Sequence, residues 1–276
     1  MPWPASVGII GLGRMGLPMA RHLSAAGFPV WGCDTDPKRR EMLVGAGGKS
    51  TDSPRALGEI CDAVLIMVAD DAQVKAVTLG PGGYLETARP GSALIIASSV
   101  KPQTCAQIAD AARPKGVGVL DAPVTRGQRA AEAGTLTVLV GGPREVFERC
   151  RPVLAAFGRQ IFHLDEQVGA GQVAKMANNL LLWTGVAGVH AAFSLARRLG
   201  VRPTRLREAL AASSADSYVL REMDLLTLAW PDKDLAQLAA MAEDAGIALP
   251  LVGYVRELIS GVTREELRRL CSDEIP

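Results

Sequence analysis

A short apolar run that leads directly into a glycine turn constrains the fold of this chain more than any other feature. Val7–Ile10 is followed at once by Gly11–Gly16, which has the pattern Gly-x-Gly-x-x-Gly, and a helical pattern then runs to Gly27. A second apolar run, Pro29–Cys33, ends on Asp34, 23 positions beyond the first glycine. A strand, a glycine turn, a helix and a second strand in this order predict a βαβ unit, the start of a parallel sheet.

Strand-like and helical segments continue to alternate up to about residue 164. Continuous apolar runs of strand length occupy residues 63–68, 92–97, 118–120, 136–140 and 161–164, and helical stretches occupy 71–79, 103–112 and 143–157. This alternation predicts a largely parallel sheet covered on both faces. From residue 169 onward only helical patterns stand out. We therefore expect an α/β chain with a Rossmann dinucleotide-binding domain over residues 1–164 and an all-α domain over residues 165–276.

The charge and cysteine content exclude several classes of function. The chain has 30 basic and 29 acidic residues, a net charge of +1, so no overall field attracts nucleic acid or an anionic membrane. The five cysteines form no CxxC pair and the three histidines lie far apart, which argues against a disulfide framework and against a metal site. We expect a cytoplasmic protein with no metal, no nucleic-acid partner and no membrane partner.

The glycine turn has the context that a dinucleotide site requires. Gly11 permits a tight turn, Gly13 lets the backbone approach a pyrophosphate, and Gly16 allows close packing of the helix. The N-terminus of the helix favours the anion. Asp34 would accept hydrogen bonds from the ribose hydroxyls and repel a 2′-phosphate, which favours NAD. Three basic residues just beyond it, Lys38 to Arg40, could still accommodate a phosphate, so NADP is not excluded. The alternative is a structural turn with no nucleotide.

The segment Gly169–Asn179 places Lys175 and Asn179 on one face of a helix, because side chains four residues apart are neighbours there. The helix continues without charge from residue 176 to residue 196. An ammonium at the head of an apolar helix must be paired, lowered in pKa or used for chemistry, unless the lysine simply extends its head group into water at the helix end. The uncharged stretch has transmembrane length, but Asn178, Asn179 and His190 within it favour a helix buried at a domain or subunit interface.

Three segments resemble, in order, the signatures of the β-hydroxyacid dehydrogenases, which include 3-hydroxyisobutyrate dehydrogenase and tartronate semialdehyde reductase. The N-terminal signature is Gly8–Ala20, the substrate-binding segment is Asp121–Leu136, and the catalytic segment is Gly169–Asn179. Lys233–Leu235 and Leu249–Leu251 also match at family-like spacing. The resemblance covers nearly the whole chain. It implies an NAD(P)-dependent oxidoreductase that interconverts a short hydroxy acid and its aldehyde or keto form.

By this resemblance Lys175 is the general acid and base. As an ammonium it gives a proton to the carbonyl oxygen during reduction, and as a neutral amine it takes the hydroxyl proton during oxidation. Free lysine has a pKa near 10.4, so work near neutral pH requires a lower value, to which a second cation at Lys233 would contribute. Asn179 would bind the substrate oxygen or orient Lys175. Ser99 would lie near the nicotinamide and the substrate, or instead cap the helix that follows Pro102.

The resemblance also assigns the binding residues. The coenzyme site consists of the glycine turn and the ends of the following strands, together with one residue of the helical domain: Gly11, Leu12, Gly13, Arg14, Met15, Gly16, Asp34, Val68, Ala69, Ser99 and Lys233. The substrate site, for a small anionic molecule, consists of Ser99, Thr125, Arg126, Gly127 and Lys233.

Arg126 departs from the family, which usually has serine-glycine-glycine where this chain has Thr125-Arg126-Gly127. A guanidinium suits a carboxylate, a phosphonate or a sulfonate, and sulfolactaldehyde reductases of the family carry an arginine at a similar place, although Leu182 replaces the hydroxyl residue expected in that subgroup. The alternatives are an outward-facing arginine or one bound to the coenzyme phosphates.

The chain is also shorter than its relatives between Ser213 and Lys233 and after Gly261. A non-catalytic nucleotide-binding protein is therefore a second alternative. Imine reductases share the fold but usually lack the lysine at the position of Lys175, and 6-phosphogluconate dehydrogenase has a larger helical domain. The apolar helix from residue 176 predicts a homodimer or a higher homo-oligomer.

Overall fold

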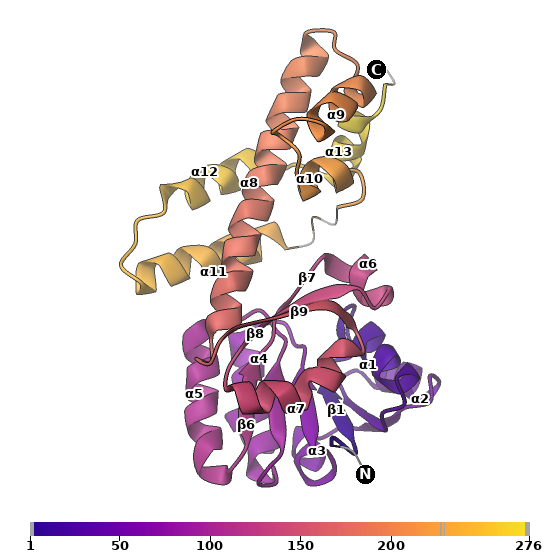
Figure 1. Ribbon diagram of the computed structural model, residues 1–276, viewed down its shortest axis with the longest axis vertical. Helices are drawn as coiled ribbons and strands as arrows, with labels where there is room; N and C mark the ends of the chain where they lie inside the picture. The colour runs from indigo at the N-terminus through magenta and orange to yellow at the C-terminus, as the bar shows by residue number, and fades with distance from the viewer. Residues whose placement is uncertain (1–2, 227, 229, 274–276) are drawn as a thin grey trace. The chain divides into compact units, whose positions relative to one another are not determined.

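The computed structural model of the chain describes residues 3–226, 228 and 230–273. It contains two compact units, Met1–Lys175 and Met176–Pro276. Helix α8 (Ala170–Arg198) begins in the first unit and continues into the second (Figure 1). The boundary that the sequence predicts, between residues 164 and 165, precedes this helix and stays a prediction.

The first unit is built on one mixed sheet with the order β3-β2-β1-β4-β5-β6-β8-β7, and β9 pairs with β8. Its strands are β1 (Val7–Ile10), β2 (Val30–Cys33), β3 (Lys49–Thr51), β4 (Ala63–Ile66), β5 (Ala93–Ile96), β6 (Gly118–Asp121), β7 (Val124–Thr125), β8 (Leu136–Gly141) and β9 (Gly158–Asp165). Strands β1 to β6 pair in parallel, and β8 runs antiparallel to β6 and β7. This is the doubly wound order, in which the chain changes direction across the sheet between β1 and β4.

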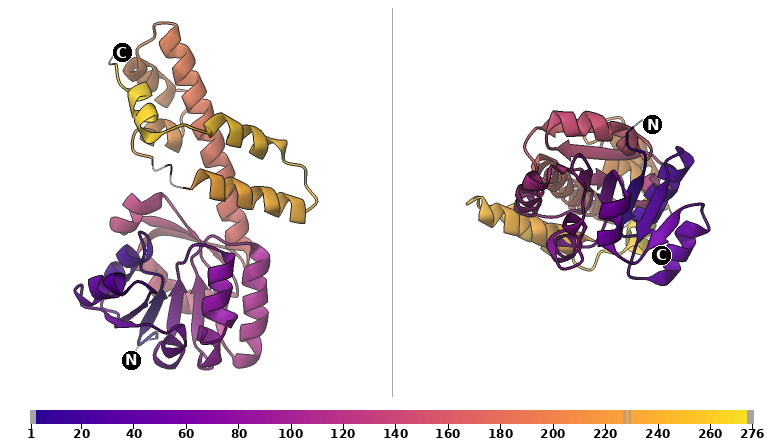
Figure 2. Two further views of the ribbon diagram at one scale, coloured as in Figure 1. Left: turned by 180° about the vertical axis from the view of Figure 1, so that it is seen from behind. Right: turned by 90° about the horizontal axis from the view of Figure 1, so that it is seen from below.

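Helices cover both faces of this sheet (Figures 1 and 2). The helices and short 3₁₀ turns of the unit are α1 (Gly16–Ala25), α2 (Pro37–Val44), α3 (Pro54–Ile60), α4 (Asp71–Leu79), η1 (Tyr84–Glu86), α5 (Pro102–Ala112), η2 (Arg113–Lys115), α6 (Gly127–Glu132) and α7 (Arg144–Ala155). Alternate residues of the central strands enter different cores, as the period of two in a strand requires. Ile9 belongs to the core shared with α1 and α7, and Ile10 belongs to the core shared with α3, α4 and α5.

The described residues of the second unit form helices and the loops that connect them, and no strand. After α8 it contains α9 (Pro203–Ala211), α10 (Tyr218–Glu222), α11 (Pro231–Asp244), α12 (Pro250–Ile259) and α13 (Arg264–Cys271). Apolar side chains of α8, α11 and α12 form one core, in which Trp183 and Leu235 are buried. A second core, around Phe193 and Met223, joins α8 to α10 and α13.

Helix α8 has the length and composition of a membrane-spanning helix. Its most apolar 18-residue window has a mean hydropathy of 1.3, and 28% of that window is buried. Length and composition alone are shared by membrane spans and by long helices that pack against protein.

Candidate functional site

The three glycines of the turn after β1 have different neighbours. A Cβ atom on Gly11, which has a φ of +94°, would overlap the carbonyl oxygen of Met67, and one on Gly16 would overlap the carbonyl oxygen of Gly11. A Cβ atom on Gly13 would meet only Arg39, whose Nη1 atom lies 3.8 Å away. Gly11 and Gly16 are therefore needed for packing, whereas Gly13 leaves room for a ligand to approach the backbone.

This room lies where a doubly wound sheet binds dinucleotides. The turn follows the carboxyl end of β1, next to the point at which the sheet order reverses towards β4. Helix α1 starts at Gly16, and its N-cap residue, Met15, makes no side-chain capping bond. A pyrophosphate in the space beside Gly13 would meet this helix N-terminus, so the residues present fit a dinucleotide coenzyme.

Asp34 stands at the end of β2 as a fixed acceptor. Its side chain is 6% exposed. Its Oδ2 atom accepts a hydrogen bond of 2.7 Å from the backbone N–H of Leu12, and its Oδ1 atom accepts one of 2.8 Å from the backbone N–H of Asp36. The carboxylate therefore connects the glycine turn to the loop after β2, with lone pairs left for ribose hydroxyls.

The loops after β4 and β5 are joined through Ser98, which the sequence analysis did not single out. The backbone N–H of Val68 donates to Ser98 Oγ at 2.8 Å, and Ser98 Oγ donates to the carbonyl oxygen of Val68 at 2.9 Å. Ala69 donates its N–H to Gln73 Oε1 at 3.0 Å. Ser99 is half-buried. It does not cap helix α5, because the N-cap position is Lys101, so that alternative for Ser99 is wrong.

A buried carboxylate fixes the start of helix α8. Asp121, at the end of β6, is fully buried, and it accepts hydrogen bonds of 2.6 Å from the N–H of Gly169 and 2.8 Å from the N–H of Gln172. Burial raises its pKa, while these backbone hydrogen bonds lower it in part. An anion at a helix N-terminus is stabilised by the helix dipole, so Asp121 holds α8 at the carboxyl edge of the sheet.

Gln172 extends this connection to the loop that carries Ser99. Its Nε2 atom donates to the carbonyl oxygen of Ser98 at 2.9 Å, and its Oε1 atom accepts from the N–H of Val100 at 3.1 Å. Both bonds are buried. Lys175 lies three residues further along α8, on the same face, and is half-buried. Ser99 and Lys175 are 76 positions apart in the sequence, and the hydrogen bonds of Gln172 join the two segments that contain them.

Asn179 lies one turn beyond Lys175 on α8. Its side chain is 1% exposed, and its Oδ1 atom accepts from Asn178 at 3.2 Å. Its Nδ2 atom has no hydrogen-bond partner among the described residues. A buried amide N–H₂ without a partner costs free energy, which is the pattern expected where a ligand oxygen completes the site.

In the second unit, Lys233 lies on the first turn of α11. Its neighbour Asp234 accepts a hydrogen bond of 3.1 Å from Nε1 of Trp183 on α8. Trp183 is one turn beyond Asn179. Within this unit, the start of α11 is therefore held against the part of α8 that follows Asn179.

The segment that the sequence predicts to bind the substrate has an unusual backbone at Arg126. Thr125 is buried in β7 opposite Thr137 of β8. Arg126 has a φ of +80°, the one left-handed non-glycine residue in the described chain, and Gly127 follows with a φ of +71°. Left-handed conformation is costly for a residue with a Cβ atom, so this turn has the backbone conformation of a glycine pair although its first residue is an exposed arginine.

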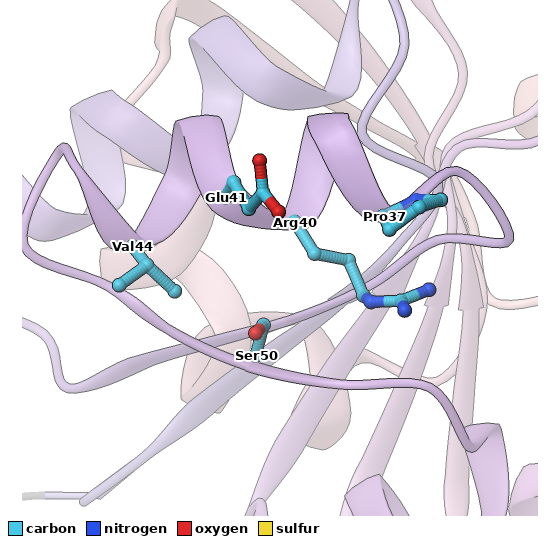
Figure 3. A pocket seen from close by; sticks show the side chains of 5 residues that line it. All are labelled: Pro37, Arg40, Glu41, Val44 and Ser50. Carbon is cyan, nitrogen blue, oxygen red and sulfur yellow. The ribbon is translucent and has the colours of Figure 1, made fainter.

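An open pocket of about 250 Å³ lies between α2 and β3, lined by Pro37, Arg40, Glu41, Val44 and Ser50 (Figure 3). The Arg40 side chain lies beside Ser50 in this pocket, and its Nη1 atom donates to the backbone oxygen of Asp34 at 2.5 Å. Of the basic residues that the sequence offers for a coenzyme phosphate, Arg40 lines this pocket; the predicted substrate residues do not.

Two known protein families match this chain, one in each half of the sequence. Residues 6–165 match the family described as the NAD binding domain of 6-phosphogluconate dehydrogenase. Residues 169–271 match the family described as NAD-binding of NADP-dependent 3-hydroxyisobutyrate dehydrogenase.

Individual relatives extend over nearly the whole chain. It is 36% identical over 275 residues to a 3-hydroxyisobutyrate dehydrogenase of Pseudomonas aeruginosa, with 92% of this chain and 91% of the relative covered. It is 31% identical over 266 residues to a 2-(hydroxymethyl)glutarate dehydrogenase of Eubacterium barkeri, with 92% and 88% covered. A solved structure of a Mycobacterium tuberculosis 3-hydroxyisobutyrate dehydrogenase with L-serine is 25% identical, with a TM-score of 0.87 and 98% of each chain covered.

These relatives confirm the fold class and the family that the sequence predicts, and they favour neither a phosphonate- or sulfonate-specific enzyme nor a non-catalytic protein. The chain belongs to the β-hydroxyacid dehydrogenase family and is an NAD(P)-dependent oxidoreductase that acts on the CH–OH group of a small hydroxy acid.

Proposed function

We propose that Lys175 is the general acid and base of this dehydrogenase. The observation that supports this role most strongly is the anchoring of α8: Asp121 and Gln172 fix its first turn against the loop of Ser99. A proton-transfer group must be held within hydrogen-bond reach of the reacting oxygen, and a rigid helix base provides such a position. The bound coenzyme supplies the hydride acceptor or donor. Lys175 removes the hydroxyl proton in oxidation and returns it to the carbonyl oxygen in reduction.

Asn179 is proposed to bind the oxygen on which this proton moves. Its Nδ2 atom is buried without a partner in the described chain, and a donor at that place stabilises negative charge as it develops on the oxygen. Ser99 is proposed to contact the substrate and the nicotinamide. Lys233 is proposed to bind the anionic end of the substrate or the coenzyme, and to lower the pKa of Lys175 through its charge.

The substrate is proposed to be a short hydroxy acid with a carboxylate. Thr125 offers a hydroxyl, Gly127 a backbone N–H and Arg126 a guanidinium that can bind both carboxylate oxygens. The coenzyme is proposed to sit on the glycine turn, with contacts to Leu12, Arg14, Met15, Val68 and Ala69, and to be NAD by preference. Asp34 supports that preference because its carboxylate is buried and fixed by two backbone N–H groups.

The enzyme is further proposed to be a cytoplasmic homodimer or higher homo-oligomer that binds neither membrane nor nucleic acid. Helix α12 supports the assembly, because Leu251, Tyr254 and Leu258 form an exposed apolar stripe, 42–65% exposed, beside the buried face of the helix. On α8, Leu181 is 73% and Leu195 is 63% exposed. Apolar stripes of this kind are typical of subunit interfaces.

The substrate proposal is tested by NADH consumption with short aldehydes and ketones that differ only in a carboxylate, sulfonate or phosphonate tail. We expect the carboxylates to turn over fastest. Arg126→Met should raise KM for that tail about tenfold or more, whereas Arg129→Met, a matched change on helix α6, should leave it within about threefold. Faster turnover of a sulfonate or phosphonate would overturn the carboxylate assignment, and no turnover of any tail with NADH or NADPH would overturn the catalytic roles.

A further inference from the structure

Three consecutive basic residues follow the ribose-binding strand, and they occupy different surroundings. Lys38 is exposed, and only its backbone N–H takes part in the capping of α2, where it donates to Asp36. Arg40 lies in the pocket between α2 and β3, with Nη1 on the backbone oxygen of Asp34 (Figure 3). Of the three, Arg39 has its guanidinium beside the carboxylate of Asp34 and the open space at Gly13.

Arg39 stands between the carboxylate for the ribose and the space for the pyrophosphate. Its Nη1 atom is 3.5 Å from Asp34 Oδ2, and its Nε atom is 3.5 Å from Asp36 Oδ2. The same Nη1 atom is the nearest neighbour of the open space at Gly13, 3.8 Å from where a Cβ atom would be. The adenosine ribose bridges these two places in a dinucleotide on this fold, so its 2′ position lies within the reach of the Arg39 side chain.

The present partners of Arg39 hold it weakly. Both ion pairs are long, and the Arg39 side chain is 48% exposed, a setting in which ion pairs contribute little. A 2′-phosphate carries up to two negative charges and three acceptor oxygens, so it is a stronger partner for a guanidinium than either carboxylate. Asp34 cannot turn away from such a phosphate, because both of its oxygens are held by backbone N–H groups. A cation beside it is therefore required if the site is to accept the phosphate at all.

We propose that Arg39 is the residue that determines coenzyme choice. It neutralises Asp34 and Asp36 when NAD is bound, and it leaves them for the 2′-phosphate when NADP is bound, so that the site accepts both coenzymes despite the aspartate at the end of β2.

The proposal is tested by calorimetric titration of the full chain with 5′-AMP and with adenosine 2′,5′-bisphosphate (2′,5′-ADP), which differ only in the 2′-phosphate. We expect wild type to bind 2′,5′-ADP within about tenfold of 5′-AMP. Arg39→Met should weaken 2′,5′-ADP about tenfold or more and 5′-AMP less than about threefold. Lys38→Met removes the same charge one residue away and should change the ratio of the two affinities less than about twofold. Retained binding of 5′-AMP shows that each variant is folded.

Asp36→Asn provides the opposite change. Asparagine caps a helix as well as aspartate does, so α2 is preserved while one carboxylate that competes for Arg39 is removed. We expect 2′,5′-ADP to bind about threefold or more tighter, with the affinity for 5′-AMP unchanged. Three results would overturn the proposal. Arg39→Met could weaken the binding of both ligands equally, or leave the binding of 2′,5′-ADP unchanged, or wild type could show no measurable binding of 2′,5′-ADP.

Discussion

The buried carboxylate of Asp121 accepts a hydrogen bond of 2.8 Å from the backbone N–H of Gln172, and this pair joins the end of β6 to the first turn of α8. The Gln172 side chain then binds Ser98 and Val100 in the loop after β5. These bonds hold the end of β6, the first turn of α8 and the loop after β5 together, one turn before Lys175. The position of the proposed acid and base depends on these few bonds.

Gln172→Met should destabilise the protein by about 2–4 kcal/mol, because the Ser98 carbonyl and the Val100 N–H lose their buried partner without a change in side-chain length. The free energy of unfolding from urea denaturation measures this. Gln128→Met serves as the control, since Gln128 donates to Glu132 on the exposed surface at 2.8 Å, and its loss should cost less than about 0.5 kcal/mol. Equal costs at the two positions would contradict the anchoring role.

The pKa of Asp121 predicts a specific pH dependence of stability. Burial raises this pKa above 3.8, so between 3.8 and the folded-state value the folded protein binds more protons than the unfolded protein. The contribution of Asp121 to the free energy of unfolding therefore falls as the pH rises through that window and is constant above it. Asp121→Asn removes this contribution. The difference in unfolding free energy, wild type minus variant, should fall from pH 4 upward; a difference that rises with pH would contradict the raised pKa.

The glycine turn permits a paired test of fold and binding. Gly13→Ala adds a methyl group that meets nothing closer than Arg39 at 3.8 Å, so the unfolding free energy should change by less than about 0.5 kcal/mol. The methyl group fills the space for the pyrophosphate, and Kd for NADH should rise tenfold or more. In Gly16→Ala the added methyl group overlaps the carbonyl oxygen of Gly11, so the free energy of unfolding should fall by about 1–3 kcal/mol. Fluorescence titration with NADH, combined with urea denaturation, separates the two effects. Normal NADH binding by Gly13→Ala would show that this space is not the coenzyme site.

Arg126→Gly should change stability and substrate binding in opposite directions. Glycine adopts a φ of +80° without a Cβ penalty, so the protein should become more stable by about 0.5–1 kcal/mol, while KM for the carboxylate rises. Arg129→Gly, within helix α6, should instead cost about 1 kcal/mol. Thermal unfolding and steady-state kinetics on the same samples compare the two variants. Loss of stability in Arg126→Gly would mean that the guanidinium contributes to the fold rather than to the substrate.

The central strands were predictable from sequence because both of their faces are buried. Residues 7–10 coincide with β1, and the runs that start at 63 and 92 contain β4 and β5. Strand β3 (Lys49–Thr51) gave no signal, since it is a short edge strand with a single neighbour and no buried side chain. Helix α2 was also missed, because Leu43 is its one buried residue and no apolar stripe forms.

The residues of the candidate site also fall into those that the sequence predicted and those that it did not. The placement of Asp34 beside the glycine turn was predictable because the spacing is local, and that of Lys175 and Asn179 on one helix because they are four residues apart. Gln172 lies in the same segment, but its hydrogen bonds reach residues 72 and 74 positions away, and no local pattern predicts such contacts. Ser98 was passed over for its neighbour Ser99 because a sequence does not show which of two adjacent serines faces the loop of Val68.

The role of Lys175 is tested most directly by the rate of hydride transfer in a single turnover of Lys175→Met, with saturating coenzyme and the hydroxy acid that wild type oxidises fastest. We predict a rate about 10²–10⁴-fold below that of wild type, with Kd for NADH changed less than about threefold. A rate within about fivefold of wild type, at unchanged coenzyme affinity, would contradict the assignment of Lys175 as the general acid and base.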